Sequence, residues 1–200
     1  MLFRYLLLVV SSLVFLSLSG CATTKSPYDH PPKWFKPEKQ QKSCPDLSGL
    51  YDNMSALESE HQINFSLFRT LFPSLSLAYS GCYDCTVDIR WFDDKKNTLS
   101  VTISDPTGKL ETTTRQLIKS SGDFRCENGA LIIDYKLLFE LVLMGGYTSG
   151  TNRFYKGSDG TAMCEKNYSS YFHYHYFIPF FSSATNQKNF LRWGNLLLLH

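Results

Sequence analysis

The sequence predicts a mainly β fold built as an antiparallel meander, and three observations lead to that expectation. Tyr and Phe number 12 and 15 among 200 residues, while charged residues make up only 19%, a balance that suits half-buried strands better than helices. Leu99, Val101 and Ile103 alternate with polar residues, as in a strand with one buried face. Turn signals recur too closely for long crossover helices, which favours antiparallel pairing and leaves a barrel or half-barrel open.

Residues 1–20 have the order of a secretory signal peptide. Arg4 supplies the only charge, an apolar stretch follows over residues 6–16, and small residues come next. That stretch is shorter than the roughly 20 residues that a helix needs to cross a bilayer. The segment is therefore expected to be cleaved and not to remain as a membrane span.

The end of this segment, Leu18-Ser19-Gly20-Cys21, resembles the lipobox of bacterial lipoproteins. The resemblance implies diacylglycerol on the Cys21 sulfur, cleavage before Cys21 and attachment to a membrane through acyl chains, since two chains anchor a protein durably. Because Ala22 and not Asp follows the cysteine, the family's sorting rule implies the outer membrane, with the domain facing the periplasm. An ordinary signal peptide that precedes an unmodified cysteine is the alternative.

Residues 21–43 are expected to form the lipidated cysteine and a flexible tether, because Pro, Lys and Gln replace any apolar periodicity. Trp34 and Phe35 interrupt this tether, either as a docking spot or as side chains packed on the domain's edge. Residues 44–200 are expected to form one β-rich globular domain. Its opening, Cys44-Pro45-Asp46-Leu47-Ser48-Gly49, resembles that of uncharacterised bacterial lipoproteins and implies no activity.

One short helix is expected near residues 55–72. Apolar residues can share a helical face there, Ser55 and Glu58 have the spacing of a capping box, and Pro73 would end the helix. Alternation at residues 63–67 competes with this assignment.

The strands are expected to pair through three hairpins. The Asp105–Gly108 turn separates the strand around residues 99–104 from a Thr-rich run over residues 110–117. Asn128-Gly129 is a strong signal for a two-residue hairpin turn, and residues 157–160 form the third. Residues 137–144, the most apolar stretch after residue 20, predict a buried strand or a short core helix.

Five cysteines remain beside Cys21, in a compartment where disulfides persist. They are Cys44, Cys82, Cys85, Cys126 and Cys164. An odd number leaves at least one thiol free or intermolecular, and the sequence leaves the pairing open.

The spacing of Cys82 and Cys85 permits thiol–disulfide exchange, but the strand-like residues 86–92 that follow favour a structural bridge over a redox enzyme. A tetrahedral zinc site would need a second ligand pair, and no second close pair of cysteines occurs. His173 and His175 would share one strand face, so they are weak metal candidates, and two hydrogen-bonded histidines are the simpler interpretation. No cofactor is expected.

The functional expectation is a non-catalytic binding or structural role in the cell envelope, with an envelope protein as the candidate partner. A formal net charge of +2 does not indicate a basic surface for nucleic acid. No catalytic motif occurs in the sequence. A carrier of a lipid or other apolar ligand is the alternative, because the aromatic residues 171–181 could line a cavity, form a partner surface or fill the core. An envelope thiol enzyme using Cys82 and Cys85 is the third candidate.

Overall fold

The computed structural model describes residues 33, 37, 43–55, 65–74, 82–140, 144–174 and 183–196, and it confirms a mainly β fold. Its strands form two antiparallel sheets, one in the order β1-β2-β3-β4 and the other in the order β5-β6-β7-β8-β9. Each sheet is a meander, as expected. A single bridge between Tyr51 and Asn195 joins β1 to the chain after β9, but the sheets do not close into a barrel.

The four-stranded sheet consists of β1 (Gly49–Asp52), β2 (Thr86–Trp91), β3 (Thr98–Ser104) and β4 (Thr113–Ile118). The five-stranded sheet consists of β5 (Arg125–Glu127), β6 (Ala130–Glu140), β7 (Met144–Lys156), β8 (Ala162–Tyr174) and β9 (Ser183–Trp193). Two short helical segments, α2 (Leu67–Leu71) and the 3-10 turn η2 (Lys119–Ser121), complete the described elements. None of the described helices is long and apolar enough to cross a membrane.

The three predicted hairpins all form. Asn128 and Gly129, with φ values of 52° and 74°, join β5 to β6 in the left-handed conformation that two-residue hairpins need. Residues 105–108 turn between β3 and β4, where the Gly108 amide donates to the Asp105 carbonyl at 3.0 Å. Residues 157–160 turn between β7 and β8. Local turn chemistry therefore sets most of this topology.

The helix is shorter than predicted and its cap is a different residue. α2 begins after Ser66, whose hydroxyl accepts a hydrogen bond from the Arg69 amide. Ser55 instead accepts from the Phe65 amide at 3.1 Å, so it does not cap this helix. α2 ends before Pro73, as expected, and residues 56–64 lie outside the described residues.

A single buried cluster joins the two sheets and α2. The fully buried Trp193 stacks on Phe154 with ring centroids 6.3 Å apart, and the Asn152 amide of β7 donates to the Thr70 carbonyl of α2 at 2.8 Å. The rest of the cluster includes Val87, Val101, Ile103, Leu131, Ile133, Cys164 and Leu191. The helix and the four-stranded sheet therefore pack on the same face of the five-stranded sheet, which we call the inner face.

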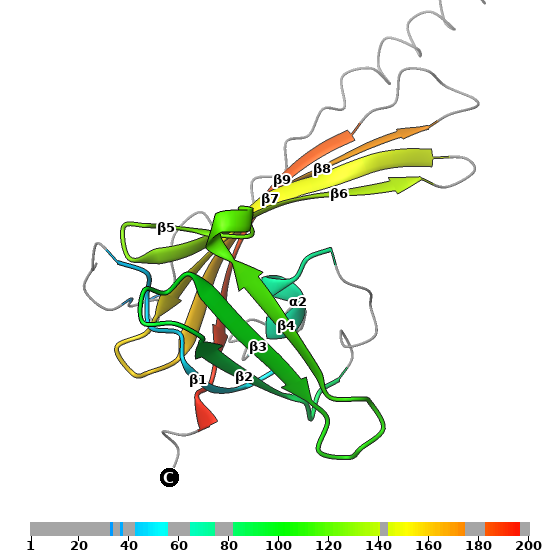
Figure 1. Ribbon diagram of the computed structural model, residues 1–200. Helices are drawn as coiled ribbons and strands as arrows, with labels where there is room; N and C mark the ends of the chain where they lie inside the picture. The colour runs from blue at the N-terminus through cyan, green and yellow to red at the C-terminus, as the bar shows by residue number, and fades with distance from the viewer. Residues whose placement is uncertain are drawn as a thin grey trace, which may run out of the picture.

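The five-stranded sheet continues well beyond this core (Figure 1). We call the projecting part the arm and define it as residues 135–140, 144–150, 168–174 and 183–187. Its side chains, where described, are half-buried or exposed, and Leu138 is 76% exposed. The expected strand forms through Glu140, but the expected burial is wrong at Leu137 and Leu138, which are half-buried and exposed; residues 141–143 lie outside the described residues. The end of β6 lies on the projecting part of the sheet, beyond the four-stranded sheet (Figure 1).

Candidate functional site

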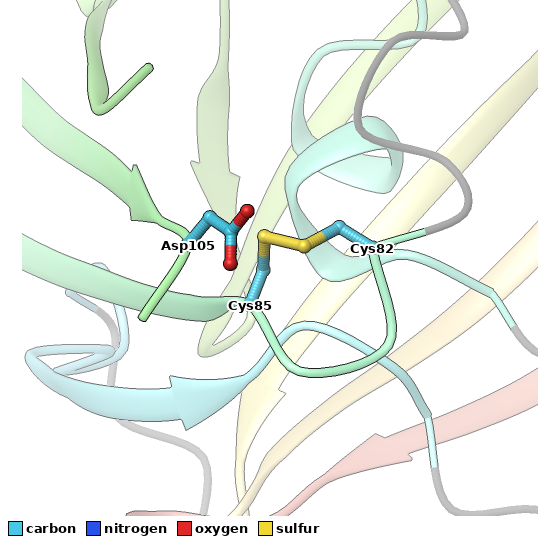
Figure 2. Close-up of side chains that lie close together, drawn as sticks. All are labelled: Cys82, Cys85 and Asp105. Atoms are coloured by element: carbon cyan, nitrogen blue, oxygen red, sulfur yellow. A yellow bond between two sulfur atoms is a disulfide. The ribbon is translucent and has the colours of Figure 1, made fainter. Parts of the chain in front are cut away.

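The cluster of chemically reactive side chains in the described residues consists of Cys82, Cys85 and Asp105 (Figure 2). Their sulfur and carboxylate oxygen atoms lie within 4.8 Å of one another. Strand pairing brings them together, because Thr86 is opposite Ser104 in the β2–β3 register, and Cys85 and Asp105 are the next residues outward. The sequence predicted Asp105 only as a turn residue, although the β2–β3 register places it beside Cys85.

The cysteines at this site form a disulfide with each other. The buried Asn53 holds the loop that carries them: its side-chain amide donates to the Cys82 carbonyl at 3.1 Å, and its backbone amide donates to the Cys85 carbonyl at 3.0 Å. The Asn53 side-chain oxygen accepts from the Ser66 hydroxyl at 2.8 Å and from the Phe68 amide at 3.3 Å. Asn53 therefore fixes the disulfide loop and the start of α2 together.

The Asp105 carboxylate is occupied by its own turn. One oxygen accepts from the Thr107 amide and hydroxyl at 2.8 and 2.7 Å, and the other accepts from the Leu110 amide at 3.0 Å. The hydrogen bond from the Thr107 side chain is the main cause of a lowered pKa of Asp105. Since disulfide sulfurs are not thiolate ligands, a metal ion could be held only after reduction.

The surroundings of Cys82 and Cys85 favour a structural disulfide over a redox-active one. Cys82 is half-buried and is followed by a loop and then β2, so it does not begin a helix that would stabilise its thiolate. The nearby Asp105 carboxylate would disfavour a thiolate in the reduced pair, which removes the usual source of an easily reduced bond. The arrangement fixes the entry to β2, consistent with the structural interpretation of the sequence.

The other predicted cysteines fall into a second bridge and one free thiol. Cys44 is bonded to Cys126, which attaches the start of the domain to β5. Cys164 is free and fully buried, and burial raises the pKa of its thiol. The odd cysteine expected from the count is therefore Cys164.

The remaining predicted site residues lie at or beyond the edges of the described chain. His173 belongs to β8, where it pairs with Gly145, and His175 lies outside the described residues, so the structure does not place the pair. Cys21 and the pair Trp34–Phe35 also lie outside them.

The arm offers a second candidate site on its outer face, which is turned away from the four-stranded sheet. Leu138, Tyr147 and Tyr171 are cross-strand neighbours there. The two tyrosine rings stack with centroids 5.5 Å apart and an interplanar angle of 27°. The sequence showed the abundance of aromatic residues, but strand register was needed to reveal that these three form one row.

No protein-family model matches the chain, and the comparisons with curated proteins and with solved structures found no match either.

Proposed function

We propose that the protein is a membrane-anchored envelope lipoprotein whose domain has a non-catalytic binding role, exercised through the arm. The binding role is supported by the extension of β6–β9 beyond the core (Figure 1). Within the described part of the chain no second layer covers the arm, so burial there offsets less of the conformational entropy that ordering its strands costs. A function for the exposed surface explains why the strands continue.

The attachment part of the proposal is supported by the Leu18-Ser19-Gly20-Cys21 motif. In this proposal, lipid on Cys21 holds the protein at the outer membrane on the periplasmic side, and residues 22–43 separate the domain from the lipid surface. Attachment restricts the domain to a thin layer and raises its effective concentration toward other envelope components.

A Cys21→Ala substitution in the full chain tests the attachment. The wild-type chain should incorporate radiolabelled fatty acid and sediment with membranes, whereas the variant should lose both properties while keeping a folded domain. Firm membrane association of Cys21→Ala, resistant to high salt and carbonate, would refute lipid anchoring.

The binding role is tested with the same Cys21→Ala protein, because it separates binding from membrane insertion. We expect it to co-sediment saturably with washed envelopes from cells that lack the gene, and Tyr147→Ala to weaken this binding. Phe92→Ala is the matched control, since Phe92 is 76% exposed and follows β2, away from the arm. Equal binding by the two variants, or none by the parent, would refute the role of the arm.

A further inference from the structure

Strand β6 forms one edge of the arm, and along most of its length that edge faces no other described strand (Figure 1). β5 pairs with β6 only over residues 130–132, whereas β7 pairs with it over residues 131–140. The register with β7 is unbroken, so no bulge bends this edge away, and no proline interrupts residues 133–140. An edge of this kind is a template for another strand.

The hairpin between β5 and β6 fixes which main-chain groups point out of this edge. Glu127 and Ala130 flank its two-residue turn as a pair, so they exchange main-chain hydrogen bonds. Because this pattern alternates along a strand, the amides and carbonyls of Asp134, Lys136 and Leu138 point to the side of β5, beyond its end. All three residues are exposed. An added antiparallel strand would therefore form its hydrogen bonds with these positions.

We propose that the added strand is β6 of a second copy of this chain, paired antiparallel about a two-fold axis at Leu138. The inference goes beyond the binding role proposed above and does not rest on it. In this pairing Leu138 is opposite Leu138 of the second copy. Lys136 is opposite position 140, which is a glutamate in the sequence. The same surface is used by both copies, so the contact closes on itself as a dimer.

The neighbouring strand and the charge pattern select this axis. An axis before Leu137 would bring the second strand into the place that β5 occupies beside residues 130–132. An axis at Leu137 would put Asp134 opposite the glutamate at position 140, and like charges directly opposite destabilise a strand pair. An axis beyond Leu138 would leave only the last residues of β6 to pair. At Leu138, residues of opposite charge face each other on both sides of the axis, which stabilises the pair.

The pairing also accounts for the exposure of Leu138. Leu138 is opposite Tyr147, which is opposite Tyr171, so an apolar row crosses the arm and ends at the open edge of β6. Leu138 is 76% exposed there. The second copy would continue the row with its own leucine and tyrosines, and the two leucines would cover each other. Strands β6–β9 of both copies would then form one continuous sheet without an open edge at β6.

The contact is small, which determines how it can be detected. Residues 136–140 of each copy pair, and a strand edge of this length buries less than the roughly 800 Å² per partner of a standard stable interface. We therefore expect a weak dimer that is favoured by a high local concentration. Cross-linking in the envelopes of cells that produce the full chain detects such a contact.

Single cysteines on the exposed edge test the register. In Leu138→Cys the two Cα atoms of the dimer would be about 5.5 Å apart, which a disulfide can span. In Lys136→Cys, on the same edge and face, they would be about 14 Å apart, which is too far. After oxidation with copper phenanthroline, non-reducing gels should show at least fivefold more dimer for Leu138→Cys than for Lys136→Cys. Phe92→Cys, at a site that is 76% exposed and away from the arm, should stay at the wild-type background.

A second change tests the charge pairing. Adding Lys136→Glu to Leu138→Cys puts a glutamate opposite the one at position 140 and should lower the dimer yield severalfold, whereas adding Lys136→Gln should lower it less. Circular dichroism checks that each variant keeps its strands. No dimer above background, as much dimer from Lys136→Cys as from Leu138→Cys, or a yield that ignores Lys136→Glu would overturn the inference. If the Cys21→Ala protein still bound envelopes lacking the gene and needed Tyr147 to do so, the proposed function would stand without the dimer.

Discussion

Removal of the disulfide between Cys44 and Cys126 should be the most destabilising covalent change available to the domain. The bridge closes a loop of 82 residues, whereas the Cys82–Cys85 bridge spans only 3. Loop-closure entropy gives about 4.5 kcal/mol for the long loop and about 1.6 kcal/mol for the short one. The Cys44→Ala/Cys126→Ala variant should therefore lose about 3 kcal/mol more stability than the Cys82→Ala/Cys85→Ala variant.

Urea denaturation followed by circular dichroism and by tryptophan fluorescence measures both losses. The comparison is matched, because each double variant removes two sulfur atoms. Each pair also contains one buried cysteine, since Cys44 is 5% exposed and Cys85 is 1% exposed. For a chain of this size the long-loop loss corresponds to about 10 °C or more in Tm. Equal losses in the two variants, or a larger loss from the short loop, would refute loop closure as the source of stability.

Four further outcomes follow from the structure. Asn53→Ala should destabilise the domain by about 2–4 kcal/mol in the same denaturation experiment, because it leaves buried polar groups without partners. Asn97 is exposed, so the control Asn97→Ala should change the stability by less than about 0.5 kcal/mol. Asp105→Ala should lower Tm at pH 7. Because the folded pKa of Asp105 lies below its ordinary 3.8, this stabilisation is present above that value and is lost as pH falls through the folded pKa, so the wild-type and variant Tm values should converge in acid. Cys164 should resist iodoacetamide in the native protein and react after unfolding in urea, as read by mass spectrometry. Gly150→Ala should disturb the β7–β8 pairing, because a Cβ atom there would meet the Asn167 carbonyl, and hydrogen exchange should accelerate in the arm before the core.

The parts of the fold that were predicted correctly depend on local chemistry. Asn128-Gly129 adopts positive φ angles that few other dipeptides tolerate, so the hairpin could be located without knowledge of the rest of the chain. The alternation of Leu99, Val101 and Ile103 with polar residues likewise predicts a strand with one buried face, whatever its position in the sheet. All three side chains are fully buried.

The errors concern features that depend on distant residues. The N-terminus of α2 is set by Ser66, and Asn53 accepts from that hydroxyl across 13 positions of sequence. The exposure of Leu138 depends on where the opposing sheet ends, which an apolar run cannot report. Asp105 joins the two cysteines only through the β2–β3 register. Capping spacing and hydropathy are local, so none of these outcomes could be obtained from them.

The composition of the arm needs two explanations, because cross-strand pairing accounts for only part of it. Without a second layer, such a sheet depends on side-chain pairs worth about 0.2–1 kcal/mol each, and the Thr148–Ser170 hydrogen bond at 2.9 Å and the stacked tyrosines serve that purpose. Pairs of opposite charge would stabilise the strands equally and would protect an exposed sheet from aggregation. The outer face carries such pairs at the base of the arm, Asp134 with Arg125 and Lys188 with Glu165, but farther out Leu138 is opposite Tyr147 and Tyr147 is opposite Tyr171. Stability alone does not require a leucine that is 76% exposed, so this apolar row is the feature that favours the proposed binding role of the arm.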